Sequence, residues 1–199
     1  MKIAIACDHG GYLLKQDILI WLEENDIDYE DFGCYSTESV DYPVFAERAA
    51  RAVAAGECDK GIVICTTGIG VSIAANKVKG IRCALCTDSL QAEMTRRHND
   101  ANMMALGAGI TGGNLAKRMV EIFLHTEFEG GRHARRVALR EAIQYTGKRI
   151  CEVNAYGNKG IQQLPWPNVR RKDRADHGAG AGAGGRGGLS GIAELCGVR

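Results

Sequence analysis

The segment best suited to chemistry is a cysteine followed by a glycine-containing turn. Cys65 ends a continuous apolar run, residues 61–65, which is typical of a strand buried on both faces. The turn that follows consists of Thr66, Thr67, Gly68, Ile69 and Gly70. Glycines let the backbone approach a ligand, and free N–H groups at the start of a helix attract anions. The helix dipole also favours a thiolate, so Cys65 could act as a nucleophile or general base. A buried structural thiol is an equally good interpretation.

The turn does not match the common nucleotide-binding motifs. Its glycine spacing differs from G-x-G-x-x-G, and no acidic residue ends the next strand at the place where such sites hold a ribose. It also lacks the G-x-x-x-x-G-K-[ST] spacing of a phosphate-binding P-loop. The turn by itself therefore indicates a site for an anion or oxyanion.

A second polar pair, Asp8 and His9, follows the apolar residues 2–7. A carboxylate beside an imidazole suits the binding of hydroxyl groups and the transfer of protons. Asp8 could equally serve as the cap of a following helix. Both interpretations remain open on this segment alone.

Two basic clusters lie farther along the chain. The first, residues 96–102, contains His98 and Asn99, and its cations could simply favour a helix C-terminus. The second, residues 130–136, places Arg132 and Arg136 on one face of a helix, because they are four residues apart. Two guanidinium groups near a helix N-terminus oppose the helix dipole, and arginine suits bidentate phosphate contacts. We therefore favour a phosphate site over a solvated helix face.

An alternation of short apolar strands and longer helices must position these residues. Strands are expected at residues 2–7, 28–32, 61–65, 82–86 and 103–106. Helices are expected at residues 12–24, 43–55, 71–77, 89–97, 114–124 and 132–145. This alternation predicts an α/β fold, a Rossmann-like three-layer sandwich with a five-stranded parallel sheet between helices. Functional groups in such sheets gather at the carboxyl ends of the strands, where Asp8, His9 and the turn after Cys65 lie.

The bulk composition argues against several classes of protein. The formal net charge is +1, so no overall field favours nucleic acid or a membrane surface as a partner. No stretch approaches the roughly 18 apolar residues of a membrane span, and the N-terminus lacks the apolar core of a signal peptide. We therefore expect a cytoplasmic protein whose eight cysteines are mostly core thiols. Cys83 and Cys86 have the C-x-x-C spacing of a redox or zinc site, but on one strand they face opposite sides.

The composition changes after about residue 151. Residues 1–150 are expected to form the one folded domain, and residues 151–199 a disordered tail. Residues 178–188 read GAGAGAGGRGG, which offers no means of burying a core. The basic run 170–172 could contact phosphate or RNA, but a solvated tail is the preferred interpretation.

Six blocks, taken in order, resemble the family of ribose-5-phosphate isomerase B and galactose-6-phosphate isomerase. They are CDHGG at 7–11, DYP at 41–43, GIVICTTGIGVSIAANK at 61–77, GIR at 80–82, HNDAN at 98–102 and EGGRHARRV at 129–137. The similarity extends from residue 1 to about residue 147, and six ordered blocks make it specific. It implies a sugar-phosphate isomerase of the non-oxidative pentose phosphate pathway. The enzyme would interconvert D-ribose 5-phosphate and D-ribulose 5-phosphate through a cis-enediolate, without a metal or organic cofactor.

The resemblance also implies the assembly and the role of each candidate residue. The family forms a homodimer or a dimer of dimers through its C-terminal helix, with active sites shared between subunits. Cys65 would be the base that moves a proton between C2 and C1, and His98 with Asp8 would assist opening of the furanose ring. The anion hole would comprise Thr67 and the backbone of Thr66, Gly68, Ile69 and Gly70. The phosphate would be held by His9, Arg132 and Arg136, and Asn99 would contact the substrate.

Two positions depart from the family pattern. Thr66 stands where the family usually has glycine in C-G-T-G-x-G, although Thr67 and the following glycines are present. Gly109 stands where many ribose-phosphate members carry arginine, which makes an isomerase of allose 6-phosphate or galactose 6-phosphate the alternative. A non-catalytic phosphosugar sensor and a thiol-redox protein using Cys83 and Cys86 are more distant alternatives.

Overall fold

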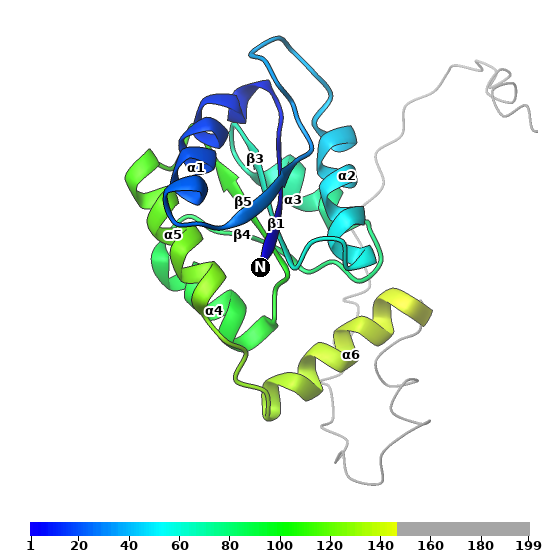
Figure 1. Ribbon diagram of the computed structural model, residues 1–199. Helices are drawn as coiled ribbons and strands as arrows, with labels where there is room; N and C mark the ends of the chain where they lie inside the picture. The colour runs from blue at the N-terminus through cyan, green and yellow to red at the C-terminus, as the bar shows by residue number, and fades with distance from the viewer. Residues whose placement is uncertain (147–199) are drawn as a thin grey trace, which may run out of the picture. The chain divides into compact units, whose positions relative to one another are not determined.

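The computed structural model describes residues 1–146, an α/β unit built on a five-stranded sheet (Figure 1). Its strands are β1 (Lys2–Cys7), β2 (Asp28–Asp31), β3 (Lys60–Cys65), β4 (Cys83–Leu85) and β5 (Met103–Gly107). Its helices are η1 (His9–Gly11), a 3₁₀ helix, and α1 (Tyr12–Glu24), α2 (Tyr42–Ala55), α3 (Ile69–Ala75), α4 (Ser89–Asn99), α5 (Gly113–His125) and α6 (Arg132–Thr146). The expected tail, residues 151–199, and the domain boundary at residue 150 lie outside the described residues.

All strand pairings in the sheet are parallel, and the strand order is β2-β1-β3-β5-β4. The fifth strand therefore lies between the third and the fourth. Because parallel strands end at the same edge, the loops after β1, β3 and β5 lie side by side. This arrangement confirms the predicted five-stranded parallel sheet.

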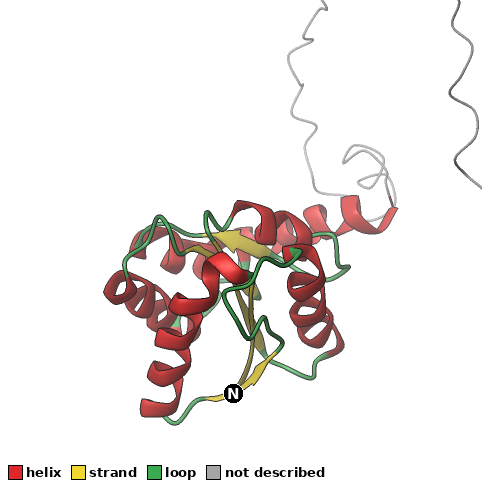
Figure 2. Cartoon of the chain, turned by 90° about the horizontal axis from the view of Figure 1, so that it is seen from above, coloured by secondary structure: helices red, strands yellow, loops and turns green. Residues whose placement is uncertain are grey.

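The strand side chains alternate between two cores, which makes the unit three layers thick (Figure 2). On β1, Ile3 and Ile5 face a core formed with α1, α4 and α5, whereas Ala4 and Ala6 face a core formed with α2 and α3. Alternation of this kind follows from the two-residue period of a strand. The small alanines face α2, whose buried side is itself mostly alanine, so helix and sheet pack closely. The predicted sandwich is confirmed.

The observed elements differ from the expected ones at a few ends. Helix α3 begins at Ile69, two residues before the expected start, because Gly68 takes a left-handed conformation (φ 76°) that turns the chain directly into the helix. Strand β4 is three residues long, since the N–H of Arg82 donates to Asn102 Oδ1 and so lies outside the ladder. The 3₁₀ helix at His9 was not predicted.

The described cysteines are buried thiols without disulfides, as expected for core residues. Cys83 belongs to the core on the α2 side and Cys86 to the core on the α1 side, so the pair is separated by the sheet. Burial raises the pKa of Cys86 to about 12, which keeps the thiol protonated and unreactive. This geometry opposes a redox or metal role for the C-x-x-C spacing. Cys151 and Cys196 lie outside the described residues.

One buried cation was not predicted from the sequence. Lys15 of α1 is fully buried, and its Nζ donates to both carboxylate oxygens of Asp31 at 2.7 and 2.6 Å. The same ammonium donates to the carbonyl of Cys34 at 2.7 Å. All three N–H groups therefore have acceptors, which is what a buried ammonium requires. The contact joins α1 to the carboxyl end of β2.

No helix within residues 1–146 is long and apolar enough to cross a membrane.

Candidate active site

The loops after three adjacent strands form one connected rim at the carboxyl edge of the sheet. The N–H of Asp8, after β1, donates to the carbonyl of Ile64 at 3.1 Å. The N–H groups of Ala108 and Gly109, after β5, donate to the carbonyls of Cys65 and Thr66, both at 2.8 Å. The backbone around Cys65 is thus fixed from both sides by its neighbouring loops.

The thiol of Cys65 is held by a backbone donor. Its side chain is buried, and the N–H of Gly68 donates to Sγ at 3.0 Å. Gly68 has a positive φ, and a Cβ there would lie 2.5 Å from Leu85 Cδ1 and 2.9 Å from the carbonyl carbon of Leu106. Only glycine can therefore present its N–H to the sulfur. A donor at this distance stabilises negative charge on Cys65 Sγ.

Asp8 and His9 lie in the neighbouring loop with their side chains oriented. Asp8 is buried and caps η1, since its Oδ1 accepts from the N–H of Gly11 at 3.0 Å. The capping interpretation of Asp8 is therefore confirmed. His9 Nδ1 accepts from the N–H of Val40 at 3.2 Å, so a neutral ring carries its proton on Nε2. That proton is available to an anion at the rim.

The threonine at position 66 fits between two glycines. A Cβ on Gly10 would overlap Thr66 Oγ1, and a Cβ on Gly109 would lie 3.2 Å from Thr66 Cγ2. Thr66, Thr67 and Ile69 are all exposed, so the turn faces solvent. The two departures from the family pattern, Thr66 and Gly109, are thus in direct contact. The absence of a side chain at Gly109 leaves room for the Thr66 methyl group.

The second group of candidate residues lies at the opposite edge of the sheet. His98 and Asn99 are in the last turn of α4, just before β5 begins, and Arg132 and Arg136 are exposed on the first turns of α6. The N–H of the Arg140 guanidinium donates to the carbonyl of Asn99 at 3.1 Å and so joins α6 to α4. A strand rises about 3.3 Å per residue, so β5 separates this group from Cys65 by roughly 15 Å.

The structure therefore gathers the predicted residues into two groups and does not join them within one chain. The rim group is Asp8, His9, Cys65, Thr66, Thr67, Gly68, Ile69 and Gly70. The opposite group is His98, Asn99, Arg132 and Arg136. A cavity of about 350 Å³ beside the opposite group is lined by His98, Asn99, His133, Arg136, Val137 and Arg140.

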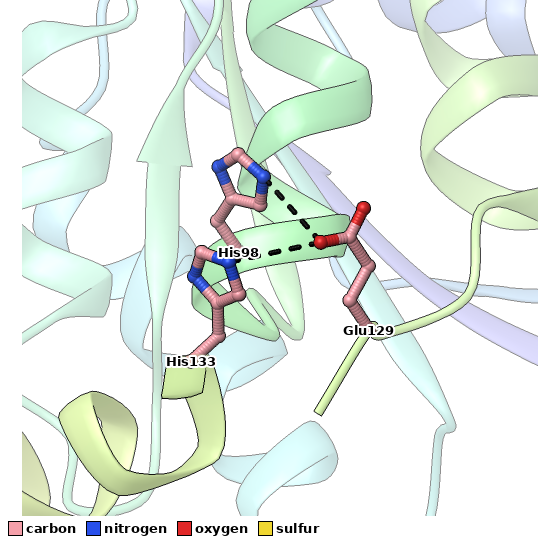
Figure 3. A group of neighbouring side chains, drawn as sticks. All are labelled: His98, Glu129 and His133. Carbon is pink, nitrogen blue, oxygen red and sulfur yellow. Dashed lines mark ion pairs between the residues drawn. The ribbon is translucent and has the colours of Figure 1, made fainter. Parts of the chain in front are cut away.

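A histidine pair with a shared carboxylate lies in the opposite group (Figure 3). The rings of His98 and His133 stack with centroids 4.2 Å apart and planes 2° from parallel. Both Nε2 atoms face the same oxygen, Oε2 of Glu129, at 3.6 Å from His98 and 3.7 Å from His133. The other oxygen of Glu129 accepts from Arg97 Nε at 2.6 Å. The carboxylate is thereby held in one orientation.

The surroundings shift the pKa values of two members of this cluster, Glu129 and His133. The hydrogen bond from Arg97 lowers the pKa of Glu129, so the carboxylate is ionised. Desolvation, followed by the neighbouring His98 and Arg132, lowers the pKa of His133, so its ring is neutral. Arg132 Nε donates to His133 Nε2 at 3.3 Å, which identifies that nitrogen as the one bearing a lone pair.

Sequence reasoning did not assign His133 or Glu129 to the site. Their spacing of four residues within EGGRHARRV was a weak signal of proximity. Their contact with His98, more than 30 residues earlier, had no signal in the sequence because it depends on how α6 packs against α4.

Comparison with known proteins identifies the family. The profile described as Ribose/Galactose Isomerase matches residues 3–139. The chain belongs to this family. It is 47% identical over 143 residues to ribose-5-phosphate isomerase B of Escherichia coli, covering 72% of this chain and 96% of that protein. It is 39% identical over 129 residues to galactose-6-phosphate isomerase subunit LacB of Clostridium acetobutylicum, covering 65% of this chain and 75% of that subunit.

A solved relative also has this fold. The structure of ribose-5-phosphate isomerase B from Clostridium thermocellum superposes with a TM-score of 0.73 at 53% identity, covering 74% of this chain and all of that one. This member of the ribose/galactose isomerase family is thus a homologue of ribose-5-phosphate isomerase B, an aldose–ketose isomerase.

Proposed function

We propose that this protein interconverts D-ribose 5-phosphate and D-ribulose 5-phosphate with Cys65 as the base. The observation that carries the proposal is the thiol of Cys65, held by the Gly68 N–H at 3.0 Å on the rim of an isomerase-family sheet. The conversion is redox-neutral, because a hydrogen leaves one carbon of the sugar and returns to the next. No organic redox cofactor is needed for it.

The proton path balances around the thiolate. Cys65 removes the proton from C2 of the open-chain aldose, and the electron pair of that C–H bond forms the C1–C2 double bond of a cis-enediolate. The former carbonyl electrons move to O1, and the O2 proton is transferred to O1. The Cys65 thiol then returns its proton to C1, which leaves a ketone at C2 and regenerates the thiolate. The reverse sequence converts the ketose to the aldose.

The developing oxyanion is stabilised by the turn after Cys65. The first turn of a helix has N–H groups without intrahelical acceptors, and those of α3 lie in this turn. Together with the hydroxyl of Thr67 they form the anion hole, in which Thr66, Gly68, Ile69 and Gly70 contribute backbone. The N–H of Gly68 is shared between the oxyanion and Cys65 Sγ. One preorganised donor typically contributes about 3–4 kcal/mol to a transition state of this kind. Asp8, buried next to the rim, assists His98 in opening the furanose ring.

The site is completed by a second copy of the chain. His98, Asn99, Arg132 and Arg136 lie at the edge of the sheet opposite Cys65, and a five-carbon sugar phosphate cannot span the roughly 15 Å length of β5. In a homodimer or a dimer of dimers, the opposite group of one subunit faces the rim of its partner, with α6 in the interface. His9, Arg132 and Arg136 then hold the phosphate, and Asn99 contacts the sugar.

A six-carbon sugar phosphate is the second candidate substrate. Compared with the family pattern, Gly109 replaces an arginine, so the rim has one cation fewer. Thr66 replaces a glycine and adds a hydroxyl and a methyl group next to Gly109. These changes alter the surroundings of the reacting end of the sugar without affecting Cys65. They favour allose 6-phosphate or galactose 6-phosphate as further substrates.

The test compares the wild type with Cys65→Ala on ribose 5-phosphate, allose 6-phosphate and galactose 6-phosphate. Loss of the base should lower kcat by about 10³-fold or more, since general bases typically contribute 10²–10⁴-fold. Cys58→Ala is the matched control, because Cys58 is also a buried thiol but lies away from the rim. Turnover in D₂O should incorporate deuterium into the product. Binding of sugar phosphate without turnover would instead indicate a sensor, and full activity of Cys65→Ala would exclude the thiol as the base.

A further inference from the structure

We propose that His98, Glu129 and His133 form a binding site for a divalent transition-metal ion, and that the ion inhibits the isomerase. The three donor atoms, His98 Nε2, His133 Nε2 and Glu129 Oε2, all lie within 4.8 Å of one another. Metal binding rests on this cluster alone. Inhibition rests on the proposed function, because the ion would occupy the ring nitrogen of His98.

The donors converge without bonding directly to one another. The distances from Glu129 Oε2 to the two Nε2 atoms are 3.6 and 3.7 Å, which exceed the length of an ordinary hydrogen bond. Zinc binds histidine nitrogen and carboxylate oxygen at about 2.0–2.2 Å, so neighbouring ligands in a tetrahedral site are about 3.4 Å apart. The two distances to Glu129 Oε2 therefore need to shorten by only a few tenths of an ångström. The two Nε2 atoms, which lie within 4.8 Å of each other, must approach by more, through a rotation of the exposed His98 side chain.

The stacked rings explain why both nitrogens point the same way. Two imidazoles with planes 2° from parallel present their Nε2 edges on one side, toward the same carboxylate oxygen (Figure 3). Arg97 holds the other oxygen of Glu129 and so orients the ligating oxygen. Outer hydrogen bonds of this kind are typical of metal-binding carboxylates.

The chemistry of the donors selects the class of ion. Two imidazole nitrogens and one carboxylate oxygen suit zinc and its neighbours Co²⁺ and Ni²⁺, whereas Mg²⁺ and Ca²⁺ require more oxygen ligands. Three protein ligands leave a fourth position for water.

The side chains of His98 and Glu129 are 38% and 36% exposed, so an ion can reach the site from solvent. One contact must break, because Arg132 Nε donates to His133 Nε2, and the exposed Arg132 side chain can turn away.

The test is a titration of the EDTA-treated full-length protein with Co²⁺, followed by the visible d–d bands of four-coordinate cobalt. We expect one ion per chain, displaced by Zn²⁺. Loss of a residue that only supports a metal ligand typically weakens binding by about 10–100-fold. Glu129→Gln and His133→Gln each remove a ligand, so each should weaken Co²⁺ binding by more than this. His125→Ala is the matched control and should bind Co²⁺ like the wild type. His125 is exposed, and in the described part of the chain its ring bonds only to its own helix.

Two further measurements keep binding separate from activity. Thermal melting checks that the glutamine variants are folded, and titration of Cys65→Ala removes the thiolate as a source of the cobalt spectrum. Binding unchanged in Cys65→Ala supports the site, whereas loss of binding in that variant would overturn it. Equal affinity in the wild type and in both glutamine variants would overturn it as well. Zn²⁺ should also inhibit isomerisation by the wild type, and EDTA should restore the activity.

Discussion

Cys65 and His98 lie at opposite edges of one sheet, Cys65 at the carboxyl end of β3 and His98 in the last turn of α4 before β5 begins. A single subunit cannot bring both side chains to one small substrate. Two chains arranged about a twofold axis can do so twice, because a symmetric interface repeats each contact.

This separation predicts complementation between two inactive variants. In a 1:1 mixture of Cys65→Ala and His98→Ala chains, refolded together, random pairing makes half of the dimers mixed. Each mixed dimer has one intact site, so the mixture should regain about a quarter of the wild-type activity. The measurement is the initial isomerisation rate before and after co-refolding. A mixture as inactive as its components would show that the active site lies within one chain.

Gly68 and Gly56 provide a matched pair for the turn after Cys65. Both have a left-handed backbone, with φ of 76° and 77°, but a Cβ on Gly56 would meet nothing within 4 Å. Gly56→Ala should cost only the conformational penalty of about 1–2 kcal/mol. Gly68→Ala should cost about 1–3 kcal/mol more through overlap with Leu85 and Leu106. It should also lower kcat, because the donor to Cys65 Sγ moves.

Urea unfolding and steady-state kinetics of the two alanine variants test this expectation. Equal losses of stability with unchanged kcat would mean that the turn accepts a side chain.

The buried Lys15–Asp31 ion pair should matter far more for stability than the exposed Lys2–Glu30 pair, whose carboxylate lies on the same strand. Lys15 has no solvent exposure, whereas the side chains of the Lys2–Glu30 pair are 44% and 45% exposed. Asp31→Asn leaves a buried ammonium without its counter-charge and should cost about 3–5 kcal/mol. Glu30→Gln should cost less than about 1 kcal/mol.

The free energies of unfolding of both variants are measured in urea. A second change, Lys15→Met in the Asp31→Asn background, should recover much of the loss, because it removes the uncompensated cation. Similar small losses for both single variants would contradict the argument.

Lys60 makes stability rise with pH in the alkaline range. Desolvation, followed by the nearby Arg96, lowers the pKa of Lys60 from 10.5 to about 8 in the folded protein. Between these values the unfolded chain binds the proton and the folded chain does not, so stability increases with pH. The penalty for burying the cation is complete below about pH 8 and is relieved as the pH rises toward 10.5.

Comparison with Lys60→Met isolates this effect, because the other titrating groups are common to both proteins. The stability of the wild type relative to the variant should rise by at most about 1.4 kcal/mol per pH unit between pH 8 and pH 10. Unfolding in urea at several pH values measures the difference. A difference that stays constant with pH would show that Lys60 keeps its ordinary pKa.

The sequence predicted the elements better than it predicted their arrangement. The apolar run at residues 61–65 predicted a buried strand, because a strand buried on both faces has no polar positions. The insertion of β5 between β3 and β4 had no local signal, because strand order depends on contacts between distant segments. The burial of Lys15 could not be predicted for a different reason. A lysine within an amphipathic helix is usually solvated, and only the position of Asp31 makes the burial of Lys15 possible.

For the candidate site, the sequence indicated only in part which of the predicted residues lie together. Asp8, His9 and the turn after Cys65 follow adjacent strands, so the rule for carboxyl ends of parallel strands placed them together. His98 and Arg132 belong to helix ends at the other edge, and that rule does not apply there. The cluster with Glu129 and His133 depends on the packing of α6 against α4, which no pattern within either helix specifies.

The strand order also constrains how the protein can emerge from a ribosome. Within residues 1–146, strand β4 has β5 as its only neighbour in the sheet, and β3 has an unpaired edge until β5 is made. When synthesis has passed β4 but not reached Met103, the nascent chain exposes an apolar strand edge and a strand without a partner. The sheet can therefore close only after residue 107 has left the exit tunnel, so a pause in translation before that point would prolong the stage most open to aggregation.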